Sequence, residues 1–260
     1  MSEVRGRALH SGADCTVRFF RRDGPVAFRR AGTDIPARAG QVVSTERSTT
    51  LGQAGETVGT VEHLLAALSI RGWWSGLLVE VSAAELPILD GSAAEWLATL
   101  DTLGPPPAAP LPFRPAGPVR VAAGGGSAAA LPGSGRLSVR IDYPHPLIGV
   151  QEWSGTPMEY ASLAAARTFG FLADMPELEK RGLARGATTD NCIVYDEQGT
   201  LGPAPAADEP VRHKALDALG DLYLLGRPLE ADVRIACGSH ALHLRLVTEL
   251  AGTAPEGTSA

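Results

Sequence analysis

Hydrophobic and polar positions alternate with a period of two in several short segments near the start of the chain. CTVRFFR at 15–21 and PVAFRRA at 25–31 both follow this pattern, and a short turn at 22–24 separates them. Alternation of this kind, interrupted by a glycine-containing turn, is typical of a β-hairpin. We therefore predict a hairpin over residues 15–31 and a further strand at 77–83, where LLVEVSA is strongly apolar.

Two segments of the same half have the apolar pattern of helices. They are TVEHLLAALSI at 60–70 and SAAEWLATLDTL at 92–103. A hydroxyl-bearing residue stands at the start of each segment and is a favourable N-cap, because its oxygen can accept from a free backbone N–H of the first turn. We predict that Thr60 and Ser92 cap these helices.

The second half of the chain repeats this order of strands and helices. Strands are predicted within 118–143 (with a turn at GGGS), at 191–197 and at 231–238. Helices are predicted around 161–167, 174–181, 211–226 and 239–250. No sequence repeat accompanies this order, so an internal duplication rests on the succession of elements alone.

A proline-rich stretch, GPPPAAPLPFRPAGP, lies between the two halves. Proline fixes φ and removes a backbone donor, so this stretch is predicted to be a semi-rigid connector. The expected organisation is an N-terminal domain at 1–103, a linker at 104–117, a C-terminal domain at 118–250 and a disordered tail at 251–260. We predict an α+β fold of two similar domains, each a β-sheet layered with helices, packed helix layer to helix layer as a β-α-α-β sandwich.

The composition is that of an ordinary globular protein, with 260 residues, 44% of them hydrophobic, and a formal net charge of −6. An acidic chain has no general attraction for nucleic acid, so we expect no nucleic-acid partner. The N-terminal residues lack the apolar run of a secretion signal, and no apolar run is long enough to span a bilayer. We expect a cytoplasmic protein, and a monomer because no long apolar surface helix is evident.

The three cysteines, Cys15, Cys192 and Cys237, are far apart in the sequence and form no CxxC pair. They are therefore expected to be small buried side chains rather than disulfide partners or zinc ligands.

The segment VRHKALDALGDLYLLG at 211–226 places polar side chains on one face of an otherwise apolar helix. His213 and Asp217 are four residues apart, so both side chains lie on the same face and can reach a single Zn²⁺ ion. Asp221 continues the line one turn further, where it can hydrogen-bond and orient a neighbouring group. The same spacing also occurs in solvated surface pairs, so it does not establish a metal site alone.

A catalytic zinc site needs a third protein ligand and one open position. His63, near the start of the predicted helix 60–70, is a candidate for this ligand. Glu62 beside it could take a proton from a metal-activated water. A lone histidine at such a position is more often a core or capping residue than a metal ligand. The neighbouring Glu62 modestly favours the metal-site interpretation.

Two further residues could take part in amide hydrolysis. His240 follows Gly238 at a predicted strand-to-helix junction, where it could donate a proton to a leaving amine. Thr168 is polar among the apolar neighbours of AARTFGF. It could lie at a strand edge, act as a cap, or donate to an oxyanion. His243, beyond His240 on the predicted helix, is interpreted as structural or exposed.

Taken together, these stretches resemble one family, the zinc-dependent UDP-3-O-acyl-N-acetylglucosamine deacetylases of lipid A biosynthesis (LpxC family). The resemblance covers nearly the whole chain, and the matching stretches occur in the family's order. They are ALHSG, TVEHLLAAL, ELPILDGSAAEWL, AARTFGF, ATTDNCIVYD, VRHKALDALGDLYLLG and GSHAL.

The resemblance implies a Zn²⁺ ion bound by His63, His213 and Asp217. It also implies Glu62 as general base on the metal-bound water and His240 as general acid to the glucosamine nitrogen. The division of proton work between these last two residues stays open.

The resemblance further implies that Lys214 and Thr168 stabilise the tetrahedral oxyanion, and that Asp221 holds and charge-tunes the acid. Phe169 would line the path of the acyl chain. His10 would lie near the substrate, an acylated UDP-N-acetylglucosamine.

Two stretches depart from the family pattern. Trp73 and Trp74 stand where the family usually has a short polar turn, and they could pack locally, cover a groove or meet a partner chain. The family's Gly-Gly-Ser is here Gly186-Ala187-Thr188. These changes put the acyl-chain length and the sugar pocket in question, and not the metal.

Two other functions stay open. One is a diverged zinc amidohydrolase acting on another N-acetylated sugar. The other is a non-catalytic relative that binds a lipid precursor or a protein partner. Glu62, Lys214 and His240 argue against the second, because a binding module has no use for an acid and a base.

Overall fold

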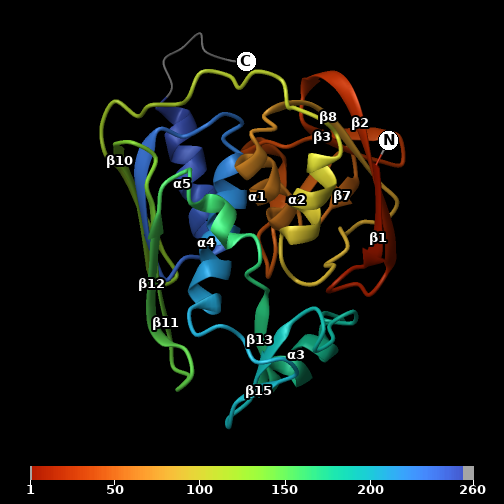
Figure 1. The fold of residues 1–260 in the computed structure, drawn as a ribbon, viewed down its shortest axis with the longest axis vertical. Helices are drawn as coiled ribbons and strands as arrows, with labels where there is room; N and C mark the ends of the chain where they lie inside the picture. Colours follow the sequence, from red (N-terminus) through yellow and green to blue (C-terminus); the bar gives the residue numbers. More distant parts are fainter. Residues whose placement is uncertain (1, 254–260) are drawn as a thin grey trace.

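The computed structural model describes residues 2–253, and it has two β-sheets on the outside with helices between them (Figure 1). The helices of this inner layer are α1 (Glu62–Arg71), α2 (Ala94–Asp101), α4 (Glu209–Tyr223) and α5 (His240–Gly252). Within the layer α1 packs against α2 and α4, and α4 packs against α5. The predicted α+β architecture, with two helix layers facing each other between two sheets, is confirmed.

The N-terminal sheet has five strands in the order β1-β2-β8-β3-β4. They are β1 (Ser2–Arg7), β2 (Asp14–Pro25), β8 (Ser75–Val81), β3 (Ala27–Arg30) and β4 (Thr33–Pro36). Strand β8 comes last in the sequence among these five strands but occupies the central position in the sheet. It runs antiparallel to β2 and parallel to β3. Alternate residues of β2, Cys15, Val17 and Phe19, are buried, which is the period-two pattern of a sheet covered on one face.

The C-terminal sheet has the same topology, in the order β12-β11-β16-β10-β9. Its strands are β9 (Val119–Ala123), β10 (Gly126–Pro132), β11 (Leu137–Tyr143), β12 (Gly149–Gly155) and β16 (Ala231–Ala236). Here too the last strand, β16, is central, antiparallel to β10 and parallel to β11. The two halves therefore share one strand order and one set of strand directions.

Two small three-stranded sheets flank this sandwich. One consists of β5 (Val42–Ser44), β6 (Thr50–Gln53) and β7 (Glu56–Val58). The other consists of β13 (Phe169–Phe171), β14 (Ile193–Tyr195) and β15 (Thr200–Leu201), and it lies with α3 (Met175–Lys180) below the helix layer in Figure 1. Short 3₁₀ helices occur at Ala39–Gln41, Tyr160–Leu163 and Leu172–Asp174.

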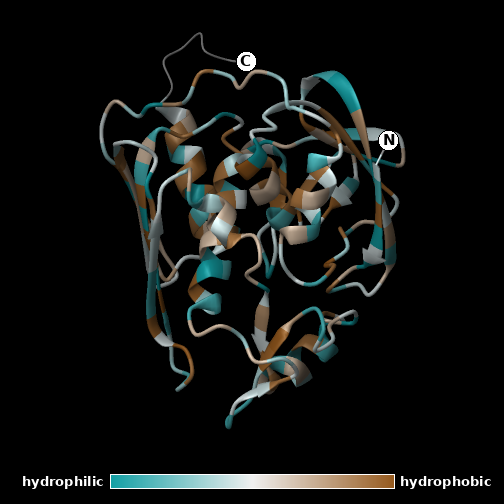
Figure 2. Cartoon of the chain, in the orientation of Figure 1, coloured by the Kyte–Doolittle hydropathy of each residue, from teal (hydrophilic) through white to brown (hydrophobic). Residues whose placement is uncertain are grey.

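The two halves meet where α1 and α4 cross. A Cβ atom on Gly220 would overlap the backbone carbonyl oxygen of Glu62, so only glycine permits this approach. Residues Glu62 to Leu68 of α1 are all buried, as is most of α4, including Leu216, Leu219 and Leu222. Hydrophobic residues, brown in Figure 2, accordingly occur along these helices and in the strands of both outer sheets.

The predicted hairpin over 15–31 is wrong. Strands β2 and β3 follow each other in the sequence, but β8 lies between them in the sheet. Alternation locates a strand and does not choose its partner. The apolar β8 sequence, buried at five of its seven positions, takes the central place in the sheet, with a neighbouring strand on each side.

The helix ends also differ from the predictions. Thr60 does not cap α1: it has a φ of +56°, and its hydroxyl donates to Glu85. The Ser92 hydroxyl accepts from the backbone N–H of Ala94, but Ala93 takes the N-cap position of α2. The helix predicted at 161–167 is only the 3₁₀ turn that ends at Leu163.

The C-terminal helix α5 ends at Gly252, two residues beyond its predicted end. From residue 254 onward the predicted tail lies outside the described residues. Residues 104–112, within the predicted linker, are in neither helix nor strand. The domain limits remain a prediction.

The cysteines are free, but only Cys15 is buried; Cys192 is partly buried and Cys237 is exposed. The prediction of three buried thiols is therefore wrong for Cys237, which lies in the turn between β16 and α5. Trp73 is buried, and Trp74 stacks on Tyr223 with ring centroids 4.6 Å apart. Both tryptophans thus have packing contacts inside the protein.

Candidate active site

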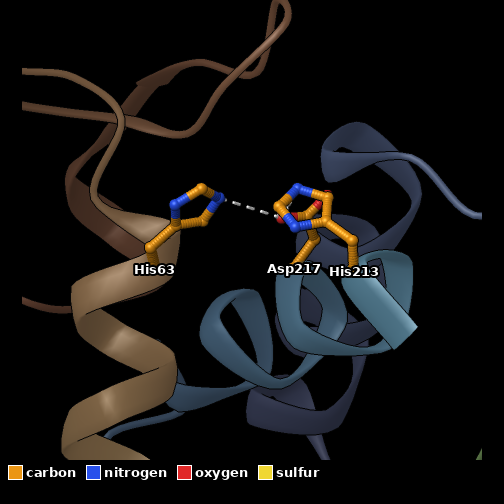
Figure 3. Close-up of side chains that lie close together, drawn as sticks. All are labelled: His63, His213 and Asp217. Carbon is orange, nitrogen blue, oxygen red and sulfur yellow. Dashed lines mark ion pairs between the residues drawn. The ribbon is translucent and has the colours of Figure 1, made fainter. Parts of the chain in front are cut away.

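The three predicted metal ligands lie together where α1 faces α4 (Figure 3). His63 projects from the first turn of α1, while His213 and Asp217 project from successive turns of α4. Asp217 Oδ1 lies 3.6 Å from His63 Nε2 and 3.4 Å from His213 Nε2. All three side chains are buried, and the three candidate ligand atoms lie within 4.8 Å of one another.

These three side chains fit a divalent metal ion. Ligand atoms bound to a tetrahedral zinc ion at about 2.0–2.2 Å are separated from each other by about 3.3–3.6 Å, which matches the two measured separations. His213 Nδ1 lies 3.0 Å from the Ala166 carbonyl oxygen, so Nδ1 carries the proton and Nε2 presents a lone pair to the other two ligands. Burial lowers the pKa of His213 to about 4, which keeps the ring neutral.

The two oxygens of the Asp217 carboxylate have different partners. Its Oδ2 atom accepts a hydrogen bond from Lys214 Nζ at 2.8 Å, which leaves Oδ1 for the two histidines. Burial raises the pKa of Asp217, but electrostatic interactions with His213 and Lys214 outweigh this and hold the pKa well below its usual value. An ionised carboxylate beside a neutral imidazole is the donor set that zinc prefers.

A second cluster, Asp221, His240 and His243, also lies within 4.8 Å, but its geometry is that of hydrogen bonding. Asp221 Oδ2 accepts from Nδ1 of both histidines at 2.8 Å. Burial lowers the pKa of His240, but the Asp221 carboxylate outweighs it and raises the pKa to about 9. For Asp221 the two effects have the opposite direction. Burial raises its pKa, but the charge and hydrogen bond of His240 outweigh this and lower the pKa to about 2. His243, interpreted as structural or exposed, is buried.

Glu62 lies beside the candidate ligands. Its Oε2 atom accepts from the backbone N–H of Thr49 at 3.0 Å, and its Oε1 atom is 3.9 Å from His240 Nε2. Burial raises the pKa of Glu62, and the positive charge of His240 opposes that shift only in part. A buried carboxylate with a raised pKa, facing a protonated histidine across a short gap, has the arrangement of a proton-transfer pair.

These residues line one cavity of about 440 Å³. Of the ten predicted site residues, all but Asp221 line it: His10, Glu62, His63, Thr168, Phe169, His213, Lys214, Asp217 and His240. Asp221 lies behind the wall, in contact with His240. The cavity has the size of a small-molecule site, with an apolar wall and a few convergent polar groups.

Thr168 reaches the cavity from the position directly before β13. Its backbone N–H donates to the Gly91 carbonyl at 2.7 Å, and its carbonyl accepts from the backbone N–H of Ile193 at 2.9 Å. A Cβ atom on Gly91 would overlap the carbonyl oxygen of Asn191, so glycine allows the ILDG turn to approach the segment that precedes β14. The two halves of the chain therefore both fix the position of Thr168.

Phe169 and His10 lie on other walls of the cavity. The Lys214 ammonium is 5.7 Å from the centroid of the Phe169 ring, within cation–π range. The backbone N–H groups of His10 and Ser11 both donate to the Glu85 carboxylate at 2.8 Å. Burial lowers the pKa of His10, which favours a neutral ring beside the cavity.

Two residues of this network were not found from the sequence. Thr49 bonds Glu62 and Asp221, and Glu85 bonds the His10 loop and the Thr60 hydroxyl. Thr49 lies in the polar run STERSTT, which carries no periodic signal. Glu85 stands within ELPILDG, one of the family stretches, and this was the only available hint.

Comparison with known proteins identifies the family of this chain. The model of the UDP-3-O-acyl N-acetylglycosamine deacetylase family matches residues 1–252. The chain belongs to this family. Three relatives named UDP-3-O-acyl-N-acetylglucosamine deacetylase illustrate the similarity. The protein from Nitratidesulfovibrio vulgaris is 44% identical over 219 residues, covering 80% of this chain and 70% of the relative. The protein from Myxococcus xanthus is 40% identical over 268 residues, covering 96% of this chain and 84% of the relative. The protein from Synechocystis is 37% identical over 269 residues, covering 96% of both chains.

The sequence-based assignment to the deacetylase family is thus confirmed. Among the described residues of this family member, no helix is both long and apolar enough to cross a bilayer.

Proposed function

We propose that this chain catalyses zinc-dependent hydrolysis of the N-acetyl amide of UDP-3-O-acyl-N-acetylglucosamine, releasing acetate in the committed step of lipid A biosynthesis. The observation that carries the proposal is the convergence, in a member of this family, of His63, His213 and Asp217 with Glu62 and His240 on one cavity.

His63, His213 and Asp217 would hold the Zn²⁺ ion. Bound there, zinc would act as a Lewis acid toward the acetyl carbonyl and lower the pKa of a water molecule from 15.7 to about 7. The remaining steps of the proposal concern side chains of this chain.

Glu62 is proposed as the general base. Its Oε1 atom is free of the Thr49 bond and would take a proton from the water that attacks the acetyl carbon. His240 is proposed as the general acid, because its Nε2 atom faces the cavity while Nδ1 is committed to Asp221. Transfer of the Nε2 proton to the glucosamine nitrogen would accompany cleavage of the C–N bond, and acetate and the free amine would leave.

The other site residues would bind or orient. Lys214 and Thr168 are proposed to donate to the oxyanion that develops on the acetyl oxygen. Asp221 would hold His240 in its donating tautomer. Phe169 would lie along the acyl chain, and His10 would lie near the sugar nucleotide.

Location and assembly belong to the same proposal. We propose a cytoplasmic monomer that binds the acylated sugar nucleotide and no nucleic acid. The net charge of −6 supports the last point, because a phosphate backbone would be repelled.

The test is release of acetate from UDP-3-O-acyl-N-acetylglucosamine by zinc-loaded protein, combined with metal analysis of the same sample. One equivalent of zinc and turnover that ends on chelation are expected. Zinc-loaded protein that releases no acetate would refute the proposal. Release from another N-acetylated sugar alone would show a diverged amidohydrolase instead.

A further inference from the structure

Thr49 connects two parts of the site that the proposed mechanism treats separately. It lies in the segment between β5 and β6 and is 1% exposed. Its neighbours are the start of α1 on one side and the Asp221–His240 pair of α4 and α5 on the other.

The backbone of Thr49 fixes the start of α1. Its N–H donates to Glu62 Oε2 at 3.0 Å, and its carbonyl accepts from the backbone N–H of Val61 at 3.3 Å. Because Oε2 is occupied in this way, the Glu62 atom left to face His240 Nε2 is Oε1. This part of the contact requires no particular side chain at position 49.

The hydroxyl of Thr49 makes the second connection. It donates to Asp221 Oδ1 at 2.5 Å. A hydroxyl has a single proton, so this bond leaves its lone pairs toward His240 Nδ1, 3.3 Å away. The Nδ1–H of His240 is then directed to the other oxygen of the carboxylate, Asp221 Oδ2, at 2.8 Å.

The hydroxyl bond matters for the orientation of the carboxylate. The terminal torsion of an aspartate is broad, so one bonded oxygen alone does not determine the plane of the group. Both imidazoles, His240 and His243, donate to the same oxygen, Oδ2. Thr49 is the described hydrogen-bond partner of Oδ1 and therefore sets the rotation of the carboxylate.

We propose that Thr49 is a positioning residue for this reaction: its backbone N–H orients the base Glu62, and its hydroxyl orients Asp221 and, through it, the acid His240. The inference rests on the proposed function, because it concerns the acid and base assigned there. Thr49 thus positions both groups from a single residue, and it is not among the residues that line the cavity.

Two substitutions at position 49 distinguish the effect of the hydroxyl group from the effect of side-chain shape. Thr49→Val keeps the branched shape and the backbone bonds and removes the hydroxyl. Thr49→Ser keeps the hydroxyl and removes a methyl group. Thr248→Val is a matched control, because Thr248 is an exposed residue of α5 whose hydroxyl bonds only its own helix.

Steady-state acetate release and zinc content are measured for all three variants. For Thr49→Val we expect kcat to fall about 10- to 100-fold with zinc content unchanged, the range typical of a lost supporting contact. KM should stay within about twofold of wild type, and Thr49→Ser should retain kcat to within about threefold. Unchanged kcat in Thr49→Val, or an equal loss in Thr49→Ser, would overturn the proposal.

Crystal structures of the wild type and Thr49→Val provide a readout that does not depend on turnover. We expect Glu62 to keep its bond to the backbone of residue 49, while the Asp221 carboxylate rotates and the His240–Asp221 bond is lost. An unmoved Asp221 and His240 would overturn the proposal. If wild-type protein releases no acetate, the proposed function fails, and this structural comparison still decides whether Thr49 orients the pair.

Discussion

The Nε2 atom of His63 lies 3.6 Å from Oδ1 of Asp217, although the two residues belong to opposite halves of the chain. Neither half alone could supply three ligands to one metal ion, because α1 contributes one candidate ligand and α4 contributes two. We expect His63→Ala to lose most of its zinc and to lower kcat/KM at least about 100-fold. Metal analysis after dialysis measures the first effect. His10→Ala, which alters the cavity but no proposed ligand, should keep its zinc, and full zinc in His63→Ala would exclude it as a ligand.

Glu62 provides a test of proton transfer with the metal left in place. Glu62→Gln keeps the size of the side chain and removes the basic carboxylate, so kcat should fall by about 100- to 10,000-fold while zinc content is unchanged. Glu95→Gln, on the exposed face of α2, is the control and should behave as wild type. Undiminished kcat in Glu62→Gln would remove this residue from the role of base.

Thr168 is expected to act through its hydroxyl. Thr168→Val should lower kcat by about 100- to 1,000-fold with little change in KM, because the oxyanion develops only in the transition state. Thr168→Ser retains the donor and should recover most of the activity. If both variants lose activity equally, the role of Thr168 is packing beside Gly91 and not hydrogen bonding to the substrate.

The placements that could be predicted are those that follow from local spacing or from a family stretch. His213 and Asp217 lie on one face of α4 because a helix brings residues four apart together, and this needs no tertiary information. The helices α1, α2, α4 and α5 were recognisable for the same reason. Without the family resemblance His63 was only one candidate ligand, because nothing within 60–70 indicates that this helix faces α4.

The missed features depend on contacts between distant segments. The central positions of β8 and β16 follow from pairing with strands far away in the sequence, which alternation cannot reveal. Thr49 meets Asp221 only after both halves have packed. The left-handed backbone of Thr60 is stabilised by its bond to Glu85, and this tertiary contact replaces the expected N-cap.

Gly220 sets the distance between the two halves at the site. A methyl group there would overlap the Glu62 carbonyl oxygen and push α1 away from α4. We expect Gly220→Ala to lower the free energy of unfolding by about 1–3 kcal/mol, despite the higher helix propensity of alanine, and to weaken zinc binding. Urea denaturation and competition with a zinc chelator measure the two effects. Gly252→Ala, where a Cβ meets no neighbour, is the control. A more stable Gly220→Ala protein would show that the helices can separate without cost.

Ionisation of Glu209 is expected to make the free energy of unfolding depend on pH. It accepts hydrogen bonds from the backbone N–H and the guanidinium of Arg167, at 3.1 and 2.8 Å. Burial raises the pKa of Glu209, but the bonds from Arg167 outweigh this, so the folded-state pKa lies below the usual value. The ionised carboxylate therefore stabilises the folded state above the unfolded pKa, and this contribution is lost as the pH falls through the folded pKa. At pH 7, Glu209→Gln should lower the free energy of unfolding by about 1–3 kcal/mol, and the difference should shrink below about pH 4. Urea denaturation across this range tests it, with Glu95→Gln expected to change stability by less than about 0.5 kcal/mol. A difference that is the same at every pH would show that Glu209 contributes through packing and not through its charge.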